Sequence, residues 1–231
     1  MQNVMRSEKK YLITLEQYYR LSGRLERIMK QDAHNGALGY KVRSLYFDTH
    51  GDQDFWDKQG GLELRKKLRL RTYSPDSGFA MLEMKKKQGD NQQKRSLKVS
   101  REDARALCRR DYTPLLSYDA PFAAECFGVL HMQGYRPRAV VEYRRRAYTA
   151  KEFSTRITFD QEVVATESCA DIFSKQLCMY PVFDPYYVIM EVKYNGCLLS
   201  YIKDLLNGCD KNELSVSKYC LGRTVSMHYD Y

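Results

Sequence analysis

In segment 62–73 the charged residues Glu63, Arg65, Lys67, Arg69 and Arg71 take every second position and alternate almost perfectly with leucines. Successive side chains of a strand point to opposite faces, so this spacing predicts a strand with one apolar and one cationic face. Like charges on one face repel each other, and a polyanion would relieve that repulsion. Phosphate fits best, because a guanidinium fork matches two of its oxygens and an ammonium adds a point charge.

Three further segments repeat this pattern with a carboxylate among the cations. Segment 79–87 places Glu83, Lys85 and Lys87 opposite Leu82 and Met84. The other two segments carry Arg156, Thr158 and Asp160, and Glu191 and Lys193, on their polar faces. The interspersed Glu side chains offer oxygen ligands for a divalent cation that bridges phosphates. A one-sided sheet with its charged face in water remains the alternative for any single strand.

The elements that must carry these residues are short strands and a few helices. Helical spacing or capping signals predict helices over 15–28, from Ser100, over 121–132 and over 198–206, the last ended by Asn207-Gly208. Period-two alternation predicts strands over 41–48, 62–73, 79–87, 138–148, 155–164 and 187–194. Many strands with interspersed helices favour an antiparallel α+β barrel.

Length, charge and cysteine content indicate the general class of protein. The chain has 231 residues, which fits a single domain over 1–231, and its formal net charge of +9 indicates an anionic partner. Seven scattered cysteines without a C-x-x-C pair predict reduced thiols in a cytoplasmic protein, and four isolated histidines give no zinc signature. No apolar segment approaches the length of a membrane span, so direct membrane insertion is not expected.

Eight short motifs, in order along the chain, now support a family resemblance. They are Lys10-Tyr11 after Arg6-x-Glu8, Ser44-Leu-Tyr-Phe-Asp48, Leu68-Arg-Leu-Arg71, Glu83-Met-Lys85, Tyr143-Arg-Arg-Arg-Ala-Tyr148, Arg156-Ile-Thr-Phe-Asp160, Glu191-Val-Lys193 and Ser217-Lys-Tyr219. From about Arg6 to Gly222 the chain resembles the polyphosphate polymerase domain of the vacuolar transporter chaperone complex, in the triphosphate tunnel metalloenzyme (CYTH-like) superfamily. The resemblance implies an eight-stranded antiparallel β-barrel tunnel with helices packed outside.

The resemblance also implies ATP and polyphosphate as substrates and Mn²⁺ or Mg²⁺ as the cofactor. By position it assigns catalytic contacts with phosphates to Arg69, Arg71, Lys85, Arg145, Arg156 and Lys218, and further phosphate binding to Lys10, Lys94 and Lys193. It assigns metal binding to Glu191, with Glu8 and Glu83 as further candidates. Glu8 and Glu83 have an alternative role, which is to orient neighbouring cations. Lys94 lies in a stretch, 89–95, that looks flexible, and Arg95 is the alternative there.

One departure from the superfamily pattern bears on the reaction. Its hydrolases and cyclases usually begin with E-x-E-x-K, whereas this chain has Arg6 in place of the first Glu. One carboxylate fewer and one cation more weaken a second metal site and strengthen polyanion binding. This favours transfer of the ATP γ-phosphate to a growing polyphosphate chain over triphosphate hydrolysis.

Alternative functions remain open from the sequence. The same residues would serve a hydrolase of inorganic or nucleoside triphosphates, or a module that binds polyphosphate without turning it over. A nucleic-acid partner is not expected, because helix-turn-helix, zinc-finger and RNA-recognition signatures are missing. The eukaryotic relatives also carry a lipid- or inositol-phosphate-sensing domain and membrane helices. Neither appears in this sequence, so a membrane-protein partner stays unknown.

Overall fold

The fold was taken from a computed structural model that describes residues 6–89, 91–207 and 217–227. The chain divides into two compact units. Unit 1 comprises Met1–Lys41, Tyr143–Val163 and Phe183–Val216, and unit 2 comprises Val42–Glu142, Val164–Val182 and Ser217–Tyr231. Each unit has its own hydrophobic core.

Ten strands hydrogen-bond in one sheet, eight of them in the order β1-β10-β8-β7-β3-β4-β5-β6. The two short strands β2 (Lys30–Gln31) and β9 (Tyr180–Pro181) pair with β7 and β8. Within the described residues this order ends at β1 and β6, which do not pair with each other. The α+β class is confirmed, but the sheet is not closed into the expected eight-stranded barrel, so a tunnel stays a prediction.

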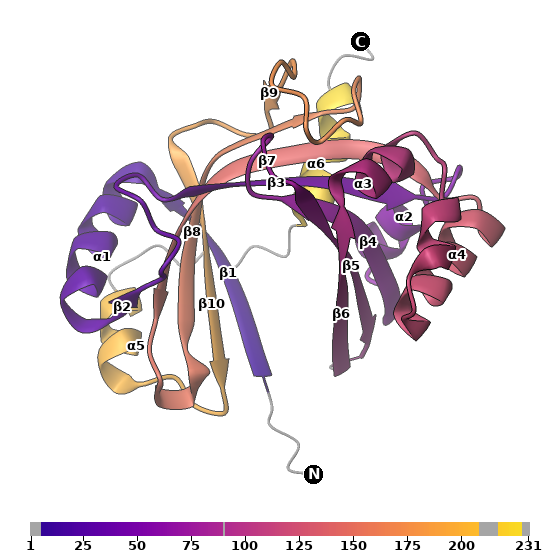
Figure 1. Cartoon of the computed structure of the whole chain (residues 1–231). Coiled ribbons are helices and arrows are strands. Elements are labelled where there is room, and N and C mark those ends of the chain that lie inside the picture. The colour runs from indigo at the N-terminus through magenta and orange to yellow at the C-terminus, as the bar shows by residue number, and fades with distance from the viewer. Residues whose placement is uncertain (1–5, 90, 208–216, 228–231) are drawn as a thin grey trace. The chain divides into compact units, whose positions relative to one another are not determined.

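Unit 1 builds its core between helices and antiparallel strands. The strands β1 (Arg6–Thr14), β10 (Tyr187–Asn195) and β8 (Arg156–Thr166) pair in that order. The helices α1 (Leu15–Ile28) and α5 (Ser200–Asn207) lie side by side against them (Figure 1). Buried Leu21, Leu25, Phe159 and Met190 belong to this core. One face of the strands is therefore apolar, and the other is left for polar side chains.

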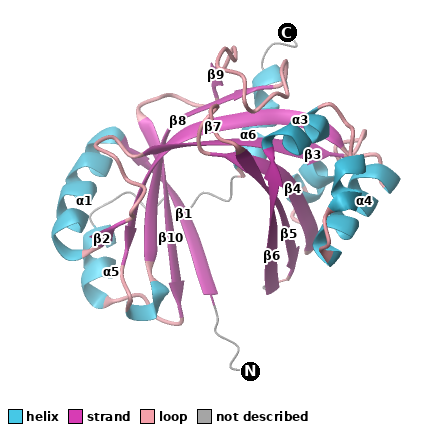
Figure 2. Ribbon diagram, viewed as in Figure 1, coloured by secondary structure: helices cyan, strands magenta, loops and turns pink. Residues whose placement is uncertain are grey.

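Unit 2 repeats this division with a longer antiparallel series. The strands β3 (Tyr40–Asp48), β4 (Leu64–Thr72), β5 (Phe79–Gln88) and β6 (Asn91–Ser100) pair in sequence order. The helices α3 (Arg101–Cys108) and α4 (Pro121–Met132) lie along β5 and β6 (Figure 2). Leu68, Leu70, Leu82 and Met84 point into the core beneath them. The cations between these residues consequently lie on the opposite face.

Most elements predicted from the sequence are confirmed within two residues at each end. The long strand β7 (Arg136–Thr149), for example, covers the predicted segment 138–148. The predicted capping box of α1 is present, with Thr14 Oγ1 accepting from the Gln17 amide at 3.2 Å. The predicted end of α5 at Gly208 lies outside the described residues. For the described ranges, no helix combines the length and apolar character that a membrane span requires.

Apart from the two-residue strands β2 and β9 and two short 3-10 helices, the sequence analysis missed four elements. Besides β1 and β6 these are α2 (Gln53–Gln59) and α6 (Lys218–Met227). The flexible stretch expected over 89–95 was wrong, because residues from Asn91 onward form β6 and pair with β5. Polar residues dominate both missed strands, so the apolar alternation that indicates a strand is weak in them.

The chain leaves helix α3 through Arg110, two residues after the last helical residue, and Arg110 has a backbone conformation that favours glycine. Arg110 has φ +69°, and the Asp111 amide donates to the Ala106 carbonyl at 3.0 Å, which is a Schellman motif. We expect Arg110→Gly to raise the free energy of unfolding by about 0.5–1 kcal/mol, because glycine adopts this conformation without the Cβ penalty. Urea unfolding measures the change. Gly134→Ala, at φ +63° after α4, should lower stability, and a loss of stability in Arg110→Gly would contradict the argument.

Candidate functional site

Eight cationic residues of unit 2 lie on one face of β4, β5 and β6, which we call the unit 2 basic face. Cross-strand register places them there: Arg69 is opposite Glu83, Lys67 is opposite Lys85, and Lys85 is opposite Lys94. The face carries Arg65, Lys67, Arg69, Arg71, Lys85, Lys87, Lys94 and Lys98. Its only carboxylate, on these three described strands, is Glu83.

Glu83 lies at the centre of this face and binds three cations. Arg69 donates from Nε to Oε2 at 2.8 Å, and Arg71 donates to Oε1 at 2.6 Å. The Lys94 ammonium lies 2.6 Å from Oε1. Burial alone would raise the pKa of Glu83, which is 2% exposed, but the three cations outweigh burial and lower the pKa to about 2. Glu83 is therefore ionised and fixes the directions of both guanidinium groups.

The amino-terminal end of α6 is anchored beside the same face. The Tyr219 hydroxyl donates to Asp48 Oδ2 at 2.5 Å, and its ring stacks on Tyr46 with centroids 5.2 Å apart. The Lys67 ammonium donates to Ser217 Oγ at 2.5 Å. Lys218, which is half-buried, is thereby placed on the first turn of a helix fixed next to β3 and β4. Gly222 allows the close approach of α6, since a Cβ there would meet Val141 Cγ2 at 2.7 Å.

Unit 1 has its own charged face, formed by β1, β10 and β8, which we call the unit 1 polar face. In its central row Lys10 is opposite Glu191, and Glu191 is opposite Thr158. In the next row Glu8 is opposite Lys193. Unlike the unit 2 basic face, this face mixes both charges in similar number.

Two lysines connect the carboxylates of the unit 1 polar face. The Lys10 ammonium lies 3.0 Å from Glu8 Oε1 and 4.0 Å from Glu191 Oε1. The Lys193 ammonium lies 3.1 Å from Glu191 Oε1 and 3.6 Å from Glu8 Oε2. Two carboxylates that share two ammonium groups are close enough to act on one ligand.

Arginines complete this face, each held by an aspartate. Arg145 makes a two-point contact with Asp160, from Nε to Oδ1 at 2.6 Å and from Nη2 to Oδ2 at 2.8 Å. Burial by itself would lower the pKa of Arg145, but Asp160 outweighs it and the pKa lies well above the usual value. Arg156 donates to Asp32 Oδ2 at 2.8 Å. Asp160 therefore fixes the direction of Arg145, and Asp32, which the sequence analysis did not single out, pairs with Arg156.

A divalent cation, which the family resemblance implies, would need oxygen ligands. Within the described residues, no three side chains among His, Cys, Asp and Glu gather in a way that could hold a metal ion. Glu8 and Glu191 form a two-carboxylate set, which suits Mg²⁺ or Mn²⁺ when phosphate oxygens and water supply the other ligands. Glu83 differs from Glu191 in the closeness of its cations: three lie 2.6–2.7 Å from its oxygens, whereas the three around Glu191 lie 3.1–4.0 Å away.

The site residues predicted from the sequence fall into two groups, one in each unit. Arg69, Arg71, Lys85 and Lys94 lie on the unit 2 basic face, with Lys218 on the adjoining helix. Lys10, Arg145, Arg156, Lys193, Glu8 and Glu191 belong to unit 1. Lys67 was missed as a site residue, although its place in the alternation of β4 could have indicated it.

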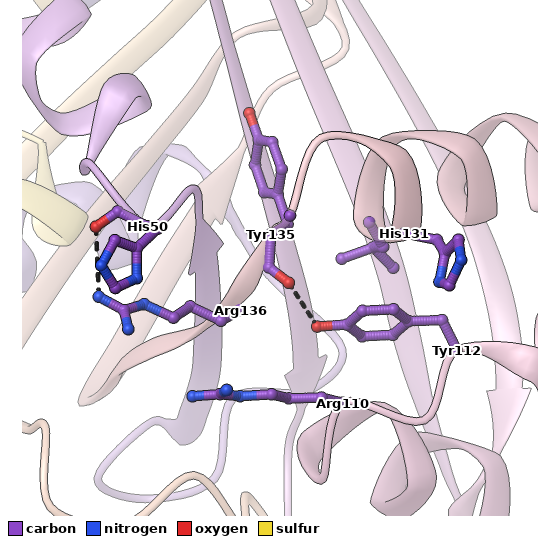
Figure 3. Close-up of a pocket in the computed structure, with 8 residues that line it drawn as sticks. His50, Arg110, Tyr112, His131, Tyr135 and Arg136 are labelled. Carbon is purple, nitrogen blue, oxygen red and sulfur yellow. Dashed lines mark hydrogen bonds between the residues drawn. The ribbon is translucent and has the colours of Figure 1, made fainter.

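A separate cavity of about 270 Å³ lies in unit 2 where α3 and α4 end (Figure 3). Arg136 donates to the His50 carbonyl at 3.2 Å, and the Tyr112 hydroxyl donates to the Tyr135 carbonyl at 2.6 Å. None of the site residues predicted from the sequence lines it. The cavity is therefore distinct from both charged faces.

Three solved structures are similar to this chain. A crystal structure of a "putative adenylate cyclase" from Bacillus halodurans aligns with TM-score 0.51 and 12% identity, covering 88% of this chain and 90% of that one. An X-ray structure with the same description from Vibrio parahaemolyticus gives TM-score 0.45 and 12% identity over 89% and 87%. The Schizosaccharomyces pombe Mediator head module gives TM-score 0.49 and 10% identity over 89% and 96%.

Sequence comparisons identify the family. No curated protein matches this chain. The model of the VTC domain, however, matches residues 5–227, which is nearly the whole sequence and includes both charged faces. This confirms the resemblance inferred from the eight motifs. The chain belongs to the VTC domain family.

Proposed function

We propose that this protein is a polyphosphate polymerase, which transfers the γ-phosphoryl group of ATP to the end of a polyphosphate chain. The observation that carries this proposal is the unit 2 basic face. Eight cations there, four on β4, two on β5 and two on β6, accompany one carboxylate. That is more positive charge than one triphosphate group neutralises, so the face suits a longer polyanion.

The reaction needs alignment and charge stabilisation more than proton transfer. A terminal oxygen of the existing chain attacks the γ-phosphorus, the bond from that phosphorus to the β–γ bridging oxygen breaks, and ADP leaves. The attacking oxygen is already ionised, so no general base is required. In this proposal Arg69 and Arg71 bind the equatorial oxygens of the transferred group, held in direction by Glu83. Lys85, Lys94 and Lys218 bind neighbouring phosphates.

Unit 1 supplies the metal ligands and further phosphate contacts in the proposal. Glu191 and Glu8 would hold Mn²⁺ or Mg²⁺, which offsets charge on the phosphate oxygens when bound. Lys10, Lys193, Arg145 and Arg156 would bind phosphate oxygens. We assign Glu83 to the orientation of cations rather than to the metal, because its three cations lie at 2.6–2.7 Å, closer than the 3.1–4.0 Å contacts of Glu191.

Product analysis with ATP and Mn²⁺ tests the proposal. A ladder of long polyphosphate chains on a gel, together with ADP, is the expected result. Orthophosphate without a ladder would show a triphosphate hydrolase instead. Tight binding of tripolyphosphate without either product would show a binding module.

A substitution at the proposed metal site gives a quantitative test. We expect Glu191→Gln to lower ATP turnover by about tenfold to a hundredfold and to raise the Mn²⁺ concentration required, since an amide is a weaker ligand than a carboxylate. Turnover as a function of Mn²⁺ concentration measures both effects. Glu162→Gln is the matched control, because Glu162 is an exposed glutamate on β8 that pairs with Arg144 at 2.8 Å and is not one of the proposed metal ligands. Equal Mn²⁺ dependence in both variants would remove Glu191 from the metal site.

A further inference from the structure

Thr158 carries a buried hydroxyl that is unexplained by the fold. The residue is 4% exposed on β8, and its Oγ1 has no hydrogen-bond partner among the described residues. A buried hydroxyl without a partner disfavours folding, because it loses its hydrogen bonds to water. Valine has the same shape and suits a strand well, so the fold alone gives no reason for threonine here.

The neighbours of Thr158 are the charged groups of the unit 1 polar face. It lies directly opposite Glu191, which in turn lies opposite Lys10. Asp160 lies two residues further along β8 on the same face, and its carboxylate accepts two hydrogen bonds from Arg145. The hydroxyl is therefore in the central row of this face, between the candidate metal ligand and the candidate phosphate-binding arginine.

The cationic side chains around Thr158 already form ion pairs with carboxylates in the free protein. Lys193 lies 3.1 Å from Glu191, Lys10 lies 3.0 Å from Glu8, and Arg145 contacts Asp160. The two lysine side chains are each 28% exposed, so their ammonium groups can turn toward an incoming anion. A phosphoryl group bound by these lysines would bring acceptor oxygens to the centre of the row, where the Thr158 hydroxyl can donate a hydrogen bond.

We propose that Thr158 Oγ1 donates a hydrogen bond to a non-bridging oxygen of a condensed phosphate bound over Lys10, Arg145 and Lys193. Thr158 is then a substrate-binding residue whose hydroxyl is satisfied only in the complex. This inference rests on the proposed function, since it takes a condensed phosphate as the ligand of this face. Binding energy from such a bond appears on complex formation, because the free protein holds the donor unpaired.

The test compares Thr158→Val with the wild type in two measurements. Calorimetric binding of tripolyphosphate, without ATP, should show a dissociation constant raised about tenfold to a hundredfold, as expected for one hydrogen bond to a charged acceptor. Thermal unfolding without ligand should show a melting temperature equal to or a few degrees above the wild type, because an unpaired buried hydroxyl is removed. Weaker binding together with undiminished stability is the signature that a merely structural threonine would not give.

Two control variants make the comparison specific. Thr158→Ser keeps the hydroxyl and should restore tripolyphosphate affinity to near the wild-type value. Thr166→Val removes a hydroxyl on the same strand that does have a partner, Ser168 Oγ at 2.9 Å. It should lower the melting temperature and leave tripolyphosphate affinity unchanged.

The outcomes separate this inference from the proposed function. A lower melting temperature in Thr158→Val would show that its hydroxyl is satisfied in the free protein and would overturn the inference. Unchanged tripolyphosphate affinity in Thr158→Val, with tight binding by the wild type, would also overturn it and leave the polymerase proposal standing. No tripolyphosphate binding by the wild type would instead overturn both.

Discussion

Arg69→Ala is expected to lower the rate of polyphosphate synthesis from ATP by about a hundredfold to a thousandfold. That is the usual loss when one well-oriented donor to transition-state charge is removed. The Arg69 guanidinium is held on two sides, by Glu83 at 2.8 Å and by the Tyr46 hydroxyl at 3.3 Å. Its direction is therefore fixed before the substrate binds, and the loss should fall mainly on kcat. Steady-state kinetics with ATP and Mn²⁺ measures it.

Arg95→Ala is the matched control for this prediction. Arg95 also pairs with a glutamate, Glu125, but it lies on the opposite face of its strand and over the Phe122 ring. Arg95→Ala should therefore keep kcat within about twofold of the wild-type value, which is the size of effect expected for a surface ion pair. Equal losses in Arg69→Ala and Arg95→Ala would show that general positive charge, and not the oriented guanidinium, supports activity.

Glu83→Gln is expected to lower the free energy of unfolding by about 3 kcal/mol at pH 7, because three cations lose a buried counter-charge. The pH dependence of the wild type should show the same contribution. The folded-state pKa of Glu83, about 2, lies below its ordinary value of 4.5, so ionised Glu83 stabilises the fold above about pH 4.5. This stabilisation is lost as the pH falls toward 2. Urea unfolding of both proteins should therefore give free energies that converge over that range.

Added anion provides a second measurement on Glu83→Gln. Tripolyphosphate can replace the missing negative charge beside Arg69, Arg71 and Lys94, so it should raise the melting temperature of the variant more than that of the wild type. Glu125→Gln is the control, because Glu125 binds Lys86 at 2.7 Å from a half-buried position outside the basic face. It should cost about 1 kcal/mol or less and show no extra anion rescue. A loss in Glu83→Gln no larger than this would mean that Glu83 does not anchor the face.

The sequence determined which side chains share a face. Alternation along β4 and β5 placed Arg69, Arg71 and Lys85 opposite the leucines, and the cross-strand register confirms it. This inference is reliable because successive side chains of a strand point to opposite faces. When the leucines are buried in a core, the side chains between them must lie on the other face. The family followed from eight motifs in order, and it is confirmed over residues 5–227.

The sequence did not determine the partners of those side chains. Glu83 was predicted as a metal ligand with cation orientation as the alternative, and only the contacts with Arg69, Arg71 and Lys94 favour the second role. Strand β6, which supplies Lys94, was expected to be flexible, since its polar residues give little apolar alternation. Its structure comes from pairing with β5 and packing against α4, contacts that local sequence does not encode.

The sequence by itself therefore determined which cations share a face of their strand, because that depends on local periodicity. Only the tertiary structure decided which carboxylates neutralise them, which hydroxyls stay unpaired and where α6 is anchored. These properties depend on register between strands that are far apart in the chain, as between Glu191 and Thr158, and no local pattern specifies that register.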